Sequence, residues 1–328
     1  MLRIAHRLLN LRPDPDDSFF WNICQSLATG ITHVVCADNV AAYMATGIGE
    51  GTDAHKIPGL VPPWRLMLME WETAFDIHDT RGRRIQQQAV FCGVTDIADK
   101  SAERGREMLS RHLDPGKNSD DTTLRDEMMK SADSSRWWLI LRPLAVSSGR
   151  LTFSPFAMNT LVAADGSLVD SVSVANGDTT AEQLRTDDMQ FLIHDMLCVA
   201  YTTLSMLNCK NVKVVDSTDI DAPPAKWQRR MKTPEIRYSR IKIDGFTSEA
   251  KTQGGGVDGH NKAWHICRGN FATYTDAKPL FGKYTGRYWR PQHVKGDKKH
   301  GEVHSTHEIA RPKTQSPAPA AANSEDRR

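Results

Sequence analysis

Cysteine is scarce and scattered in this 328-residue chain, and its spacing argues against two kinds of small scaffold. A disulfide framework or a Cys-x-x-Cys zinc knuckle needs closely spaced pairs, and no such pair occurs. We therefore expect reduced thiols. The six cysteines are Cys24, Cys36, Cys92, Cys198, Cys209 and Cys267.

Long apolar runs are also missing. No stretch approaches the ~18 uninterrupted apolar residues of a membrane helix. Residues 1–10 carry basic residues and leucines, but Asp14, Asp16 and Asp17 follow at once, without an apolar core or a cleavage site. We expect no signal peptide and no membrane partner, and hence a cytoplasmic protein.

Specific catalytic motifs are absent too. The chain has no Gly-x-Ser-x-Gly elbow, and the triple glycine at 254–256 lacks the Walker spacing that ends in Gly-Lys-Ser/Thr. No cofactor is expected.

Charge, in contrast, is strongly divided along the chain. Residues 226–299 hold 17 Lys and Arg against 6 Asp and Glu, a net +11, whereas residues 1–225 hold 21 against 30, a net −9. A polyanion is the natural partner of such a basic stretch, because each cation that meets a phosphate releases a counterion. Aromatic residues interleaved with these cations have rings that can stack on unpaired bases. The candidate nucleic-acid-binding residues are Lys226, Arg229, Arg230, Lys232, Arg237, Lys283, Arg287 and Trp289.

The hydrophobic pattern predicts an α+β fold. Residues 64–75, 87–94 and 135–146 are typical of strands, and the first two predict a hairpin. From about 180 to 208 the period becomes helical. Strands grouped before and after one long helix favour a mixed or antiparallel sheet, followed by a basic, aromatic-rich β region at the C-terminus.

Composition predicts four segments. They are an acidic α+β body (1–215), a linker with a basic segment and a Gly-rich loop (216–262), a basic aromatic region (263–297), and a disordered tail (298–328).

Histidines in the basic region suggest chemistry. His265 and His293 can act as an acid/base pair around a phosphodiester, with Arg268 and Lys283 neutralising the developing charge. Zinc ligation by His265, Cys267 and His293 is weaker, because a fourth ligand is not evident, and we assign no metal site. Packing in a strand core is the simplest alternative. Glu70 and Glu72 are a further carboxylate pair, for which an exposed strand face is the favoured interpretation.

The run HICRGNFATYTDAKPLFGKYTGRYWRPQHVKG resembles the C-terminal signature of uncharacterised proteins encoded by bacteriophages, prophages and plasmids. It covers about a tenth of the chain. Asn270 stands where that signature has histidine, and Lys295 where it has arginine. The resemblance implies a mobile-element protein in a bacterial host cell, but transfers no activity.

Three functions remain open. The preferred hypothesis is a nucleic-acid-associated accessory protein that binds RNA or DNA through its basic aromatic region. The second is a metal-independent ribonuclease-like enzyme or toxin that uses His265, Arg268 and His293. The third is a homo-oligomeric interaction protein, in which the basic region meets the acidic half of another copy.

Overall fold

The computed structural model describes the larger part of the chain. The described residues are 3–11, 18–44, 57–73, 76–79, 82–98, 102–113, 123–154, 156–175, 187–217, 236, 238–243, 263–267, 270–290, 293–295 and 297–302. For some of them only the backbone is described, namely 18–20, 102, 112, 123–124, 175, 187–194, 217, 243, 263–267 and 293–302.

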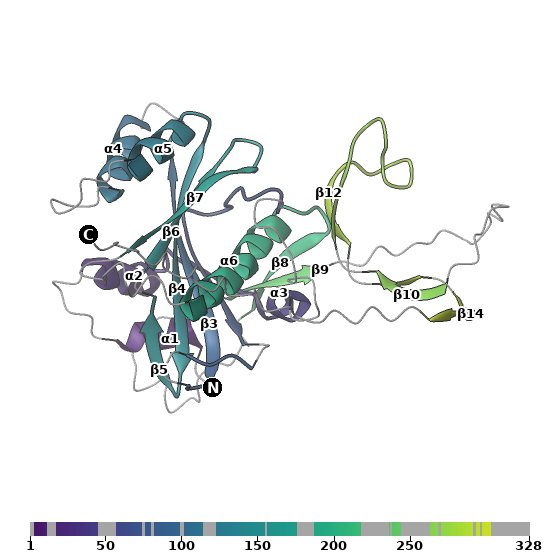
Figure 1. The fold of residues 1–328 in the computed structure, drawn as a ribbon, viewed down its shortest axis with the longest axis horizontal. Helices are drawn as coiled ribbons and strands as arrows, with labels where there is room; N and C mark the ends of the chain where they lie inside the picture. Colours follow the sequence, from purple (N-terminus) through teal and green to yellow (C-terminus); the bar gives the residue numbers. More distant parts are fainter. Residues whose placement is uncertain are drawn as a thin grey trace, which may run out of the picture. The chain divides into compact units, whose positions relative to one another are not determined.

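Helices and strands alternate in groups along the chain (Figure 1). The helices are α1 (Ile4–Asn10), α2 (Ser18–Ala28), α3 (Asp38–Tyr43), α4 (Ala102–His112), α5 (Thr123–Ala132) and α6 (Asp187–Leu207). The strands are β1 (His33–Cys36), β2 (Leu66–Glu72), β3 (Ile85–Asp96), β4 (Trp137–Ser147), β5 (Arg150–Phe153), β6 (Phe156–Val162), β7 (Leu168–Ala175), β8 (Val212–Ser217), β9 (Tyr238–Ile243), β10 (Ala263–Cys267), β11 (Asn270–Tyr274), β12 (Gly286–Arg290), β13 (His293–Lys295) and β14 (Asp297–Glu302).

A nine-stranded mixed sheet forms the centre of the fold, with the order β7-β6-β4-β3-β2-β1-β9-β8 and β5 paired to β4. β1 runs parallel to both β2 and β9, and the other described pairings in this sheet are antiparallel. The predicted α+β class is confirmed, and the sheet is mixed. The helix predicted at about 180–208 corresponds to α6, at Asp187–Leu207.

The central sheet is buried on both faces, because apolar side chains point alternately to one face and the other along its strands. Met67, Met69 and Trp71 of β2 pack in one cluster with α3 and α6, whereas Leu68 packs in another with α1 and α2. In β4, Leu139 likewise packs in the cluster that contains α6. Figure 1 shows α6 crossing the face of the sheet over β3 and β4, with α4 and α5 together at one end. The predicted β2–β3 hairpin is confirmed, with Met69 opposite Val90.

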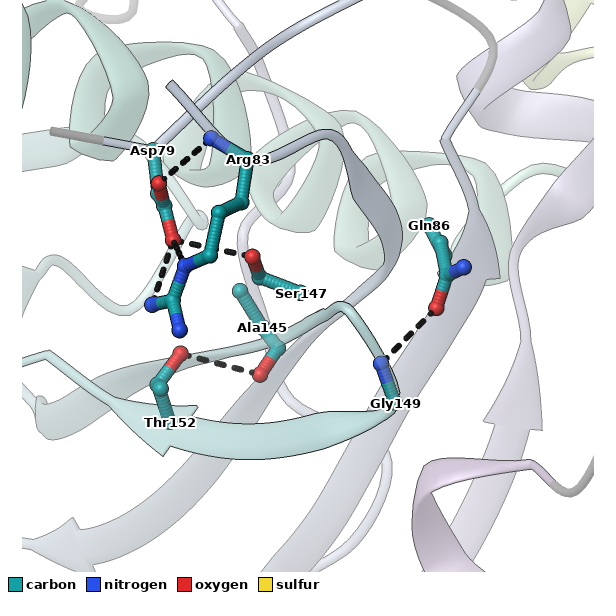
Figure 2. Close-up of polar contacts among 7 residues, drawn as sticks. All are labelled: Asp79, Arg83, Gln86, Ala145, Ser147, Gly149 and Thr152. Carbon is teal, nitrogen blue, oxygen red and sulfur yellow. Dashed lines mark hydrogen bonds and ion pairs between the residues drawn. The ribbon is translucent and has the colours of Figure 1, made fainter. Parts of the chain in front are cut away.

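A polar cluster fastens two turns at the end of the sheet where β3 begins and β4 ends (Figure 2). Asp79 Oδ2 accepts hydrogen bonds from Arg83 Nε and from Ser147 Oγ, both at 2.8 Å. Gln86 Oε1 accepts the Gly149 N–H at 3.3 Å. Asp79, paired with Arg83, thus connects the turn before β3 to the end of β4.

The chain divides into two compact units, residues 1–255 with 268–293, and residues 256–267 with 294–328. These limits differ from the predicted boundaries at 215, 262 and 297. β9 lies in the predicted linker and yet pairs with β1 and β8 of the central sheet. The second unit holds β10 and β14, which pair in parallel, and β14 continues to Glu302, beyond the predicted start of the tail at 298.

Candidate nucleic-acid interface

The β11–β12 hairpin is fixed to the central sheet at its base. Trp289 is only 1% exposed and its ring lies 4.7 Å from Phe271 and 6.0 Å from Tyr43, measured between centroids. Asn211 clamps the backbone of the same residue: its Nδ2 donates to the Trp289 carbonyl at 2.7 Å, and its Oδ1 accepts the Trp289 N–H at 2.9 Å. The prediction that Trp289 stacks on bases is therefore wrong, because its ring is in the core.

Strand alternation explains this burial. Phe271 is opposite Trp289 in the antiparallel register, so both rings share the face that packs on the core. On the other face the Tyr274 and Tyr288 rings meet edge to face at 5.9 Å, and the Arg290 guanidinium lies 5.2 Å from the Tyr274 centroid. Tyr274 and Tyr288 thus contact each other and stabilise the hairpin itself.

The hairpin tip has a different character. Leu280 and Tyr284 form a bridge, and the Lys283 N–H donates to the Leu280 carbonyl at 3.1 Å. Between them Phe281 and Gly282 have φ angles of 52° and 69°. The left-handed region suits glycine but costs about 1–2 kcal/mol for a residue with a β-carbon.

This tip presents two rings and a cation to solvent. Phe281 is 65% exposed and Tyr284 is 45% exposed. Lys283 is also exposed, with its Nζ 5.5 Å from the Tyr284 ring centroid. We call Phe281, Lys283 and Tyr284 the hairpin tip below. Lys283 is thus accessible from solvent, and its role in binding nucleic acid stays a prediction.

Arg287 points elsewhere. A β-carbon added at Gly59 would overlap Arg287 Nη1, so this guanidinium packs directly on the Gly59 backbone. Gly59 has φ +72°, and its carbonyl accepts a hydrogen bond from Asn208 Nδ2 at 3.0 Å. Arg287 thus joins the hairpin to the loop before β2, which corrects its predicted role as an outward phosphate contact.

The side chains of the other predicted site residues are not among those that the structure describes. Lys226, Arg229, Arg230, Lys232 and Arg237 lie outside the described residues. So does Arg268, and only the backbones of His265 and His293 are described. The strands that carry these two histidines, β10 and β13, are neighbours in a three-stranded sheet. Their acid/base pairing stays a prediction.

A buried polar cluster at the carboxyl ends of β1 and β2 was not predicted from the sequence. Arg3 donates to both oxygens of Asp38, at 3.0 and 2.7 Å, and Cys36 Sγ donates to Asp38 Oδ2 at 3.0 Å. Glu70 accepts the Ala5 N–H at 2.9 Å. The sequence signal was weak, because Arg3 and Glu70 are 67 positions apart in a chain with many charges.

The electrostatics of this cluster indicate a structural role. Burial alone would raise the pKa of Asp38, but hydrogen bonds from Arg3 and Cys36 outweigh it and lower that pKa. Burial, with the hydrogen bond to Asp38, raises the pKa of Cys36 to about 12. A thiol of that pKa is not a nucleophile near neutrality.

The carboxylates near β2 do not combine into a metal centre in the described part of the chain. Burial raises the pKa of Glu70 to about 7, and Asp76 pairs with Arg84 at 3.4 Å. Within the residues that the structure describes, no group of three or more His, Cys, Asp or Glu is arranged to hold a metal ion.

No protein-family model matches this chain, and neither a curated protein nor a solved structure is detectably similar to it. Among the described helices, none combines the length and apolar character that crossing a bilayer requires.

Proposed function

We propose that the protein is a nucleic-acid-associated accessory protein of a phage or another mobile element, and that the hairpin tip binds its nucleic acid. The mobile-element origin is supported by the resemblance of residues 265–296 to the phage and plasmid signature.

One observation carries the binding proposal: Phe281, a large apolar residue, is exposed at a left-handed backbone position. Strained backbone of this kind persists where the surrounding structure imposes it, and it gathers at functional sites. An aromatic ring beside Tyr284 and Lys283 is the combination that binds a base by stacking and a phosphate by charge.

The hairpin also holds the tip in place. Its base is anchored by the buried Trp289 and by Asn211, so the rings project from a fixed support. A fixed support lowers the entropy lost on binding. Residues 270–290 carry four cations, Lys278, Lys283, Arg287 and Arg290, against the single acid Asp276.

The test is fluorescence anisotropy of a labelled single-stranded oligonucleotide at two salt concentrations. A stacked base is worth about 1–3 kcal/mol, so Phe281→Asn should weaken binding about 5- to 150-fold. The matched control is Ile31→Asn, which changes another exposed apolar residue, 61% exposed, and should leave affinity unchanged. Equal affinity of wild type and Phe281→Asn would exclude the tip as the binding element.

A further inference from the structure

Lys210 lies across one face of the β11–β12 hairpin, in room that a glycine provides. Gly286 has φ +109°, and a β-carbon added there would come within 2.6 Å of Lys210 Cε and 3.1 Å of its Nζ. The Lys210 N–H donates to the Arg287 carbonyl at 2.9 Å, which fixes the start of this side chain beside β12. Lys210 is itself exposed. Because Gly286 has no side chain, this cation can lie directly on the strand.

Arg290 lies on the same face of the hairpin. Gly286 is directly opposite Tyr274, and Arg290 is four positions after Gly286 on β12. Directly opposite residues share a face, as do residues an even number of positions apart on one strand. The Lys210 side chain occupies the place of a Gly286 β-carbon, about 5 Å from the β-carbon of Tyr274, and the Arg290 guanidinium lies 5.2 Å from the Tyr274 ring centroid. We call Lys210, Tyr274 and Arg290 the Tyr274 cluster.

The two cations of this cluster are not neutralised by a neighbouring acid in the described part of the chain. No ion pair there joins Lys210 or Arg290 to a carboxylate. The residues of β11 and β12 include no Asp or Glu, and the hairpin has its single acid, Asp276, in the turn after β11. Cations that are close together and lack a counter-charge attract an anion.

The Tyr274 hydroxyl is a hydrogen-bond donor without an acceptor. Within the described structure it is buried and has no hydrogen-bond partner. A buried polar group of this kind is destabilising until it is paired. A phosphate offers negative charge and acceptor oxygens together, so one such group would satisfy the hydroxyl and both cations. The side chains of Lys210 and Arg290 are long and flexible, so they can move to admit it.

We propose that the Tyr274 cluster binds a backbone phosphate of the nucleic-acid strand whose bases stack on the hairpin tip. Tyr284 of the tip precedes Gly286 by two residues, so their Cα atoms are at most about 7 Å apart. A nucleic-acid strand advances about 3.4 Å per nucleotide, so this span corresponds to about two nucleotides. This inference rests on the proposed function and adds a phosphate contact to it.

The first experiment measures how affinity for a labelled single-stranded oligonucleotide depends on salt. Loss of one phosphate contact reduces the slope of log K against log salt by about 0.7 for a single strand, so Lys210→Gln/Arg290→Gln should reduce it by that amount. The double variant Lys210→Arg/Arg290→Lys keeps both cations and should keep the wild-type slope. Arg104→Gln/Lys130→Gln removes the same charge from exposed positions on α4 and α5 and should also keep it.

Tyr274→Phe tests the hydroxyl separately. It should weaken binding about 2- to 13-fold, the range expected for one hydrogen bond, and it should leave the slope unchanged because it alters no charge. In the free protein it should not lower the melting temperature, since the hydroxyl has no partner to lose in the described structure. Unchanged affinity, or a lower melting temperature, would refute the hydroxyl contact.

The outcomes separate this inference from the proposed function. If wild type binds, Phe281→Asn weakens binding, and Lys210→Gln/Arg290→Gln keeps the full slope, the Tyr274 cluster is refuted while the tip stands. A reduced slope with unchanged Phe281→Asn affinity refutes the tip alone. Absence of any binding refutes both. Displacement of the oligonucleotide by poly-glutamate, equally well per charge, would overturn the inference in favour of an acidic protein partner. Circular dichroism checks that each variant is folded. Lys210→Gln alone, at an exposed position, replaces the double variant if that variant is unfolded, with a smaller reduction of the slope expected.

Discussion

Glu70 makes stability depend on pH in a way that one substitution can isolate. Its side chain is 1% exposed, with Oε2 bound to the Ala5 N–H and Oε1 buried without a hydrogen-bond partner in the described structure. Glu70→Gln retains an acceptor for that N–H and removes the titrating group.

The magnitude follows from the pKa. Burial raises the pKa of Glu70 from 4.5 to about 7. At 1.36 kcal/mol per unit, this corresponds to about 3 kcal/mol. The folded state holds the proton that the unfolded state loses above pH 4.5, so stability falls as pH rises from about 4.5 to 7 and is constant beyond. The lowered pKa of Asp38 has the opposite effect on stability. Its stabilising contribution is lost as the pH falls below the pKa that an aspartate has in the unfolded chain.

Urea unfolding at pH 5 and pH 7.5 measures the effect. Between these values, wild type should lose about 2 kcal/mol more than Glu70→Gln does, because the window omits both ends of the titration. Glu72→Gln, at the exposed end of the same strand, should follow wild type. Identical pH dependence of wild type and Glu70→Gln would show that Glu70 is ionised in the folded protein and that this reasoning is wrong.

Four further predictions concern the hairpin, a packed glycine and a buried thiol. Phe281→Asn should stabilise the fold by about 1 kcal/mol, because asparagine tolerates φ 52°. A melting temperature below that of wild type would show that the backbone at Phe281 is not strained. Trp289→Ala should cost about 3–5 kcal/mol in urea unfolding, as expected for a buried aromatic residue. Gly59→Ala should destabilise more than Gly30→Ala, since both have left-handed φ but only the first meets a packed guanidinium; equal losses would argue against that contact. Burial raises the pKa of Cys92 to about 12, so a thiol reagent at pH 8 should modify it only after unfolding.

Local patterns in the sequence were enough to predict several elements. The alternation of Met67, Met69 and Trp71 with Leu68 predicted a strand, and β2 is that strand. The expectation that Glu70 lies on an exposed face is wrong, because Glu70 is buried. Period and apolar content are properties of neighbouring residues, so they are readable without knowledge of the partner strand. The basic character of the final third is also a property of composition alone.

Tertiary structure decided which strands meet and which side chains reach the surface. β9 pairs with β1 across about 200 residues, and no local pattern encodes a contact at that separation. Trp289 is a second example. The sequence predicted it at the nucleic-acid interface, whereas its packing against Phe271 places it in the core. Sequence alone determined the elements and the charge, because these depend on nearest neighbours. Burial and pairing depend on long-range contacts, so the hairpin tip appears only in the folded chain.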